Sequence, residues 1–185
     1  MKYLAFDVEA GGTTNDKSLL SVYFVVLDED LKTIHGELDL KIKPNDGVYH
    51  ITAEALEVNK INLVEHDKEA VTEGKASTLL YEFLEKHSPS GTIKLTPLGH
   101  NITFDVYFIK EHLLKNINKY VSYRVLDTSN VCQFLKLTGK VSRDLEGSLE
   151  KIANYFEVPI NLGDLHTAKG DTWLVIEVLK KMVKL

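Results

Sequence analysis

The chain has almost no cysteine, and none of its apolar runs is long. Cys132 is the single cysteine among 185 residues, which excludes an internal disulfide framework and fits a reducing compartment. No apolar run approaches the 18 or so residues of a membrane span, and no basic segment followed by an apolar one opens the chain as a leader. The sequence therefore predicts a cytoplasmic protein with no membrane partner.

Positive charge is also in short supply. The 27 acidic residues outnumber the 22 lysines and arginines, for a net charge of −5. Such a chain is not expected to grip a long duplex through general basic charge, but metal ions can offset its carboxylates and let it bind nucleic acid locally. There is no repeat, low-complexity tract or linker, so we expect a single domain over residues 1–185.

The opening stretch carries the first candidate site. Large apolar side chains stand at the even positions of residues 3–9, and the odd positions end in two acids, which is the period-2 signature of a strand. Asp7 and Glu9 therefore share one face, about 7 Å apart along it, and Ala10-Gly11 ends the strand because glycine permits turns. Two neighbouring carboxylates on a buried strand repel each other, which a bound cation or proton relieves. A strand end with two solvated acids is the alternative.

Periodicity divides the rest of the chain into further elements. Strands over residues 18–28 and 33–43 follow the first with short links, which indicates an antiparallel meander whose last strand is a charged edge. Residues 44–71 are expected to form short helical pieces that serve as a lid, a substrate wall or packing. Strands and helices then alternate, which predicts an α/β three-layer domain with helices flanking a mixed sheet. Strands are expected over residues 92–99 and 121–127, and helices over residues 73–87, 104–116, 129–138, 146–156 and 167–184.

Two later acids, Asp105 and Asp171, stand at the heads of apolar stripes on predicted helices. An acid in this position points toward the core, where an unpaired charge is costly. Each is also consistent with an acid that the helix dipole stabilises near an N-terminus. Four acids with such placement together favour a shared site.

His166 precedes Asp171 by five residues. On a continuous helix this spacing separates two side chains by roughly 140°, so we expect His166 in the loop before the helix, where it can reach the same site. A lone histidine is usually a polar loop residue. Next to a cluster of acids, it is the natural general base at physiological pH.

Three short motifs together resemble the DEDD 3′–5′ exonucleases, of the DEDDh branch with a histidine in the third motif, on the ribonuclease H-like fold. The motifs are residues 6–9, 99–105 and 166–171, with lesser echoes at residues 127–128 and 148–153. Each motif alone is weak, but all three in this order are specific. The resemblance spans about residues 2–179 and implies a mixed sheet that starts with an antiparallel three-strand meander.

The resemblance also implies the site residues. The metal ligands would be Asp7, Glu9, Asp105 and Asp171, which hold two divalent cations, Mg²⁺ or Mn²⁺. Such ions activate a nucleophile and stabilise a leaving oxygen, and they prefer oxygen ligands. His166 would deprotonate the attacking water. Substrate contacts are expected at Ala10, Gly11, His50, Asn101 and Phe104. At Ala10-Gly11 many relatives instead carry a threonine that contacts the terminal nucleotide.

The implied function is a metal-dependent 3′–5′ exonuclease that releases nucleoside 5′-monophosphates from single-stranded DNA or RNA 3′ ends. A ribonuclease H-like endonuclease or resolvase is a second interpretation, but those enzymes usually lack a base five residues before the last acid. A non-catalytic nucleic-acid-binding module on the same fold is a third, and the complete set of acids argues against it. The choice between DNA and RNA, and the formation of a homodimer, stay open.

Overall fold

A six-stranded mixed sheet forms the centre of the described chain. The computed structural model describes residues 2–161, 163 and 165–185. The strand order is β4-β3-β2-β1-β5-β6. The first three strands form an antiparallel meander, and β5 and β6 run parallel to β1. The predicted mixed sheet that starts with a meander is confirmed. Its strands are β1 (Lys2–Ala10), β2 (Leu19–Asp28), β3 (Ile34–Lys43), β4 (Val71–Thr72), β5 (Thr96–Gly99) and β6 (Leu126–Asp127).

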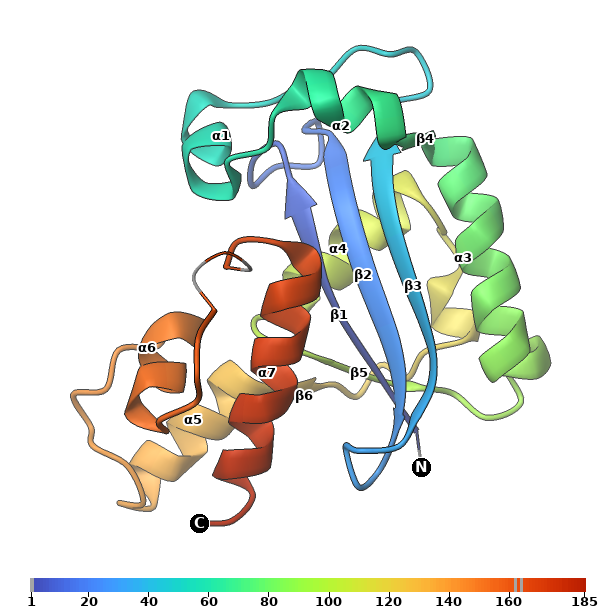
Figure 1. Cartoon of the computed structure of the whole chain (residues 1–185). Coiled ribbons are helices and arrows are strands. Elements are labelled where there is room, and N and C mark those ends of the chain that lie inside the picture. Colours follow the sequence, from blue (N-terminus) through green and yellow to red (C-terminus); the bar gives the residue numbers. More distant parts are fainter. Residues whose placement is uncertain (1, 162, 164) are drawn as a thin grey trace.

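Helices cover both faces of this sheet. One face packs against α7, beside which α5 and α6 lie, and the other packs against α3 and α4 (Figure 1). The short helices α1 and α2 lie beyond the end of the sheet at which β1 finishes. This arrangement confirms the predicted three layers. The helices are α1 (Ala53–Asn59), α2 (Leu63–Glu69), α3 (Glu73–His87), α4 (Thr103–His112), α5 (Thr128–Leu137), α6 (Leu149–Tyr155) and α7 (Ala168–Met182).

The alternation of β1 divides its side chains between two cores. Leu4, Phe6 and Val8 join the core under α3 and α4, whereas Ala5 joins the core under α7. Side chains on a strand alternate between faces, so the odd-numbered positions continue toward α7. The acids at the end of β1 consequently face the first turns of that helix.

Several strand boundaries differ from the predictions. The strands expected over residues 92–99 and 121–127 begin only at Thr96 and Leu126, and before them Leu95 and Val121 form an isolated bridge. Serine side chains hydrogen-bond to the backbone in both segments. Ser88 donates to the Ile93 carbonyl at 2.7 Å, and Ser122 accepts from the Arg124 N–H at 3.0 Å. The predicted edge strand β3 gains a two-residue partner, β4, at its last positions only.

The helix boundaries are set by caps. The helix expected from residue 146 begins at Leu149, because the Ser148 hydroxyl accepts from the Lys151 N–H and fixes the start. Thr167 does the same for α7 through the Gly170 N–H. Thr52 caps α1 as the sequence predicts. Within the described residues, no helix has both the length and the apolar character needed to cross a membrane.

The packing predicts where truncation destabilises the protein. Leu80 on α3 is fully buried, whereas Leu137 at the end of α5 is 80% exposed. We expect Leu80→Ala to lower the free energy of unfolding by about 2–5 kcal/mol because it leaves a cavity. The matched control Leu137→Ala should change it by less than about 0.5 kcal/mol. Urea titrations check both, and equal losses would contradict the placement of α3 on the sheet.

Candidate active site

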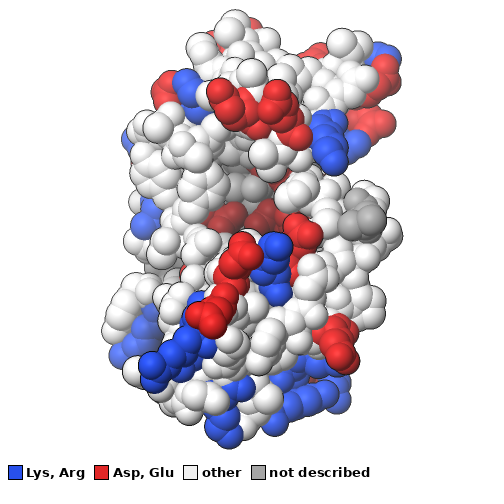
Figure 2. Space-filling model, turned by 90° about the vertical axis from the view of Figure 1, so that its left-hand side faces the viewer, with Lys and Arg blue, Asp and Glu red and all other residues white. Residues whose placement is uncertain are grey.

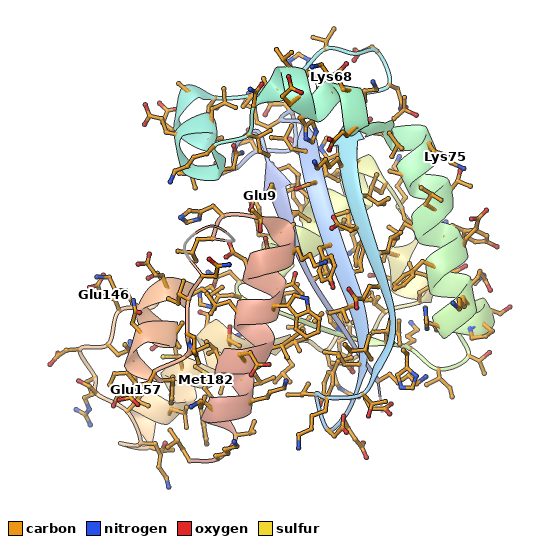
Figure 3. All side chains as sticks on the ribbon, viewed as in Figure 1. Glu9, Lys68, Lys75, Glu146, Glu157 and Met182 are labelled. Atoms are coloured by element: carbon orange, nitrogen blue, oxygen red, sulfur yellow. The ribbon has the colours of Figure 1, made fainter. Side chains whose placement is uncertain are left out.

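Three carboxylates meet where β1 ends. Asp7 and Glu9 come from the α7 face of β1, and Asp171 comes from the first turn of α7. One oxygen from each lies within 4.8 Å of the others. Figure 3 shows Glu9 between the end of β1 and the N-terminal turn of α7. The fold therefore joins acids that are more than 160 positions apart in the sequence.

The end of β1 is fixed by a close backbone approach. Gly11 is buried, and a Cβ at this position would lie 2.5 Å from the His50 carbonyl oxygen. Its N–H donates to the Ser18 carbonyl, and its own carbonyl accepts from the Thr52 N–H at 2.7 Å. Only glycine allows this approach without displacing the neighbouring chain. The strand thus stops directly after Glu9 and Ala10.

Asp105 approaches the same strand from α4. Its side chain is 3% exposed, and its Oδ1 accepts from the Val8 N–H at 3.0 Å. The pairing of β1 with β5 reaches only as far as Ala5, so beyond that point Asp105 provides the hydrogen-bond acceptor that a strand would otherwise supply. The carboxylate is therefore part of the strand's framework as well as of the acid group.

His166 lies in the loop before α7, as the spacing predicts. Its backbone is left-handed, with φ of +59°, and its N–H hydrogen-bonds to the Asp171 carboxylate. The side chain is half-buried. The histidine and the last acid are therefore held together by the backbone.

All of these side chains line one cavity of about 380 Å³. Figure 2 shows a hollow on this side of the molecule with Asp and Glu atoms at its floor. We call it the acid cavity. Its lining residues are Asp7, Val8, Glu9, His100, Asn101, Phe104, Asp105, His166 and Asp171. The structure thus brings together the predicted acids, the histidine, Asn101 and Phe104.

The other predicted substrate residues lie outside the acid cavity. Ala10 lines an adjoining cavity of about 490 Å³, which shares Val8, Glu9 and Phe104 with the acid cavity. Gly11 contributes backbone only. His50 is exposed and lines a separate depression. The structure therefore does not bring His50 to the acids, because the close approach of its carbonyl to Gly11 leaves its ring on another surface.

His100 also lines the acid cavity, although the sequence did not single it out. Its Nδ1 pairs with the Thr128 hydroxyl at 2.9 Å, and burial lowers its pKa. The ring is therefore held neutral at the cavity wall. The signal that could have found it is its place in the second motif, directly before Asn101.

Burial dominates the electrostatics of the acid cavity, and repulsion between the carboxylates adds to it. Burial and the neighbouring carboxylates raise the pKa of Asp7 well above its usual value. Burial and Asp171 raise the pKa of Glu9 to about 7. Burial also raises the pKa of Asp171, against the opposing effect of His166. No lysine or arginine of the described chain lines this cavity to compensate these charges.

This donor set fits a divalent cation. It consists of carboxylate oxygens alone, which hard cations such as Mg²⁺ and Mn²⁺ prefer. A positive ion between the three acids would also compensate their buried negative charges. The acid cavity is therefore a candidate metal centre.

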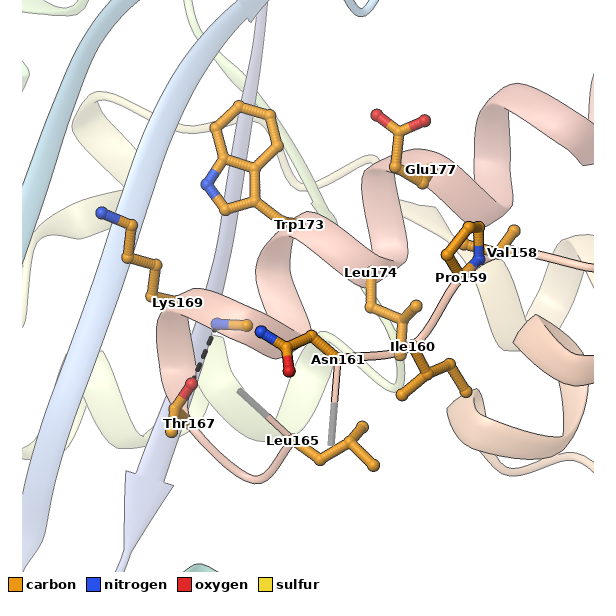
Figure 4. Close-up of a pocket in the computed structure, with 11 residues that line it drawn as sticks. Val158, Pro159, Ile160, Asn161, Leu165, Thr167, Lys169, Trp173, Leu174 and Glu177 are labelled. Atoms are coloured by element: carbon orange, nitrogen blue, oxygen red, sulfur yellow. Dashed lines mark hydrogen bonds between the residues drawn. The ribbon is translucent and has the colours of Figure 1, made fainter. Parts of the chain in front are cut away.

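A second cavity, also of about 380 Å³, lies beside α7 (Figure 4). Trp173 lines it, and at 100° per residue Trp173 points about 160° away from Asp171. Lys169 and Glu177 are its charged lining residues within the described chain, and the rest of the lining is mostly apolar. It lacks the cluster of oxygen donors that characterises the acid cavity.

Solved structures share this architecture. The exonuclease I of Methylocaldum szegediense matches with a TM-score of 0.78 at 16% identity, over 99% of this chain and 40% of that chain. E. coli exonuclease I in complex with a dT13 oligonucleotide matches at 0.73 and 17%, over 97% and 40%. The zinc-bound E. coli complex with single-stranded DNA matches at 0.73 and 19%, over 99% and 40%. This chain has the ribonuclease H-like fold of exonuclease I.

These matches establish the fold alone, because their sequence identities are below 20%. The chain spans about two fifths of the length of those enzymes. No family model and no curated protein matches the sequence. What the protein does must therefore be argued from the acid cavity itself.

Metal affinity tests the acid cluster directly. We expect Asp7→Asn to weaken Mn²⁺ binding at least tenfold, because it removes a charge from the centre of the cluster. Asp67→Asn, a half-exposed acid on α2, is the matched control and should leave the affinity unchanged. Isothermal titration calorimetry measures both. Equal Mn²⁺ affinity in the two variants would exclude Asp7 as a ligand.

The raised carboxylate pKa values predict a pH effect on stability without metal. The folded protein holds the Glu9 proton more tightly than the unfolded chain, whose carboxyl titrates near 4.5. The free energy of unfolding should therefore fall as the pH rises from 4.5 to about 7, by about 3 kcal/mol from this group. Glu9→Gln should flatten the profile, measured by urea titration in chelator. A profile that is identical in both proteins would refute the assignment.

Proposed function

We propose that the protein is a metal-dependent 3′–5′ exonuclease of the DEDDh type, which shortens single-stranded nucleic acid and releases nucleoside 5′-monophosphates. The observation that carries the proposal is the convergence of Asp7, Glu9 and Asp171 within 4.8 Å, with His166 in the same cavity. The fold shared with exonuclease I supports it, as do the oligonucleotide complexes of those enzymes. The buried, unpaired Cys132 suits the reducing cytoplasm.

The acids would hold the metal. Two divalent cations, Mg²⁺ or Mn²⁺, bound by Asp7, Glu9, Asp105 and Asp171 would supply an activated water and stabilise the leaving oxygen. In this proposal Asp105 has two duties, since it also accepts the Val8 N–H. Its loss should therefore disturb the end of β1 as well as the cations.

His166 would act as the general base. It takes a proton from the attacking water onto an imidazole nitrogen, while the water oxygen bonds to the phosphorus and the bond to the 3′ oxygen of the preceding nucleotide breaks. The leaving group is the 3′ oxygen of the shortened strand, which takes up a proton from solvent, and the terminal nucleotide is released as a nucleoside 5′-monophosphate. The hydrogen bond between the backbone N–H of His166 and the Asp171 carboxylate keeps the base beside the acids.

The adjoining cavity would take the terminal nucleoside. It borders the acid cavity through Val8, Glu9 and Phe104, so a nucleoside there places its phosphate among the carboxylates. Phe104 is 36% exposed, and its ring offers a face on which a base can stack. Base stacking needs an unpaired end, which favours a single strand as substrate.

A time course on labelled oligonucleotides tests the proposal. Single-stranded DNA and RNA of equal sequence, labelled at the 5′ end, are incubated with Mg²⁺ or Mn²⁺ and with an Asp171→Ala control. We expect a ladder that shortens by one nucleotide at a time from the 3′ end and is absent in the control; the faster substrate identifies the sugar. Internal cuts would indicate a ribonuclease H-like endonuclease, and no cutting would leave a binding module.

Removing the base should separate catalysis from metal binding. We expect His166→Ala to lower turnover by about 10²–10⁴-fold, the usual contribution of a general base, while Mn²⁺ affinity by calorimetry changes little. His35→Ala, on the outer strand β3 and paired with Asp28, is the control and should keep wild-type turnover. Unchanged turnover in His166→Ala would rule out the general-base role.

A further inference from the structure

One buried carboxylate holds the turn between β5 and α4. Asp127, the last residue of β6, is 5% exposed. Its Oδ1 accepts from the Asn101 N–H at 3.1 Å and from the Ser129 N–H at 2.9 Å. Its Oδ2 accepts from the Ile102 N–H at 3.1 Å. A carboxylate that accepts three backbone N–H groups makes strong, charge-assisted hydrogen bonds.

These bonds join the starts of two helices. Asp127 is the N-cap of α5. Helix α4 has no side-chain cap of its own, since Ile102 occupies its N-cap position. Asp127 accepts from the Ser129 N–H in the first turn of α5 and from the Asn101 and Ile102 N–H groups directly before the first turn of α4. Its negative charge also opposes the positive end of both helix dipoles.

The turn that Asp127 holds is strained. Asn101 has a φ of +56°, a left-handed conformation that costs energy in any residue other than glycine. The neighbouring Thr128 adds to the restraint, because its hydroxyl donates to the Gly99 carbonyl at 3.2 Å and pairs with the His100 ring. The junction of β6 with α5 thus determines the conformation of the turn.

The same turn builds one wall of the acid cavity. His100 and Asn101 line the cavity, and so do Phe104 and Asp105 from the first turn of α4. We propose that Asp127 is a positioning residue for the active site, an inference that rests on the proposed exonuclease function. Without its carboxylate, Asn101 leaves the left-handed region and the start of α4 frays. The cavity wall then loses its shape while the cluster of Asp7 with Glu9 and Asp171 stays intact.

A serine variant separates the two duties of Asp127. In Asp127→Ser the hydroxyl can still cap α5, but the charge and the second oxygen, which accepts from the Ile102 N–H, are lost. Asn62→Ala is the matched control, because Asn62 caps α2 through the N–H groups of Val64 and Glu65 and does not line the acid cavity. Each variant is compared by kcat and KM on a labelled oligonucleotide, by Mn²⁺ calorimetry and by amide hydrogen exchange.

We expect Asp127→Ser to lower kcat/KM by about 10- to 100-fold, because small displacements of positioned groups are costly. Mn²⁺ should still bind to the cluster of Asp7 with Glu9 and Asp171, whereas an ion that Asp105 helps to hold should bind more weakly. The Asn101 and Ile102 amides should exchange faster. Asn62→Ala should lower Tm and leave kcat/KM within about twofold, as expected of a surface cap away from the site. Asp127→Asn keeps one carbonyl oxygen and should give an intermediate loss.

Two outcomes would overturn the inference. Wild-type kcat/KM in Asp127→Ser, with faster exchange at Asn101 and Ile102, would make Asp127 a structural cap only. Unchanged exchange at those amides would refute the hydrogen bonds themselves. If the wild-type protein cleaves no strand, the proposed function fails, and the exchange measurement still tests the hold of Asp127 on the turn.

Discussion

The repulsion between buried carboxylates at the end of β1 is the constraint on which the rest of the structure depends. Asp7, Glu9 and Asp171 lie within 4.8 Å of one another, and burial raises the pKa of each. Such a cluster destabilises the folded protein unless a cation or protons neutralise it. Two apolar cores on opposite faces of the sheet supply the stability that tolerates it. The stability from these two cores therefore allows the folded protein to keep the destabilising cluster.

Backbone hydrogen bonds keep the cluster in place. Val8 donates to Asp105, which ties α4 to β1, and His166 donates to Asp171, which ties the loop to α7. Asp127 secures the start of α4 in the same way. Each contact joins an acid of one element to the main chain of another or of a neighbouring loop. The groups of the cavity are therefore positioned by the framework rather than by one another, as a preorganised site requires.

Local pattern predicted the elements of the site, and long-range contacts decided the rest. The alternation over residues 3–9 was enough to put both acids of β1 on one face, and the five-residue spacing placed His166 before its helix. The hold of Asp127 on Asn101 joins positions 26 apart and has no local signature beyond an N-cap. His50 was predicted as a substrate residue from a stretch of the sequence that carries no motif. It lies on another surface, because only its carbonyl approaches Gly11.

Crystals grown with Mn²⁺ would show whether the acid cavity binds a divalent cation, since the anomalous scattering of manganese locates the ion without any assumption about activity. We expect a strong anomalous peak in the acid cavity, with Asp7, Glu9 and Asp171 as oxygen ligands at about 2.0–2.3 Å, the range for hard divalent cations. An empty acid cavity at saturating Mn²⁺, or a peak bound only by surface acids such as Asp46, would contradict it.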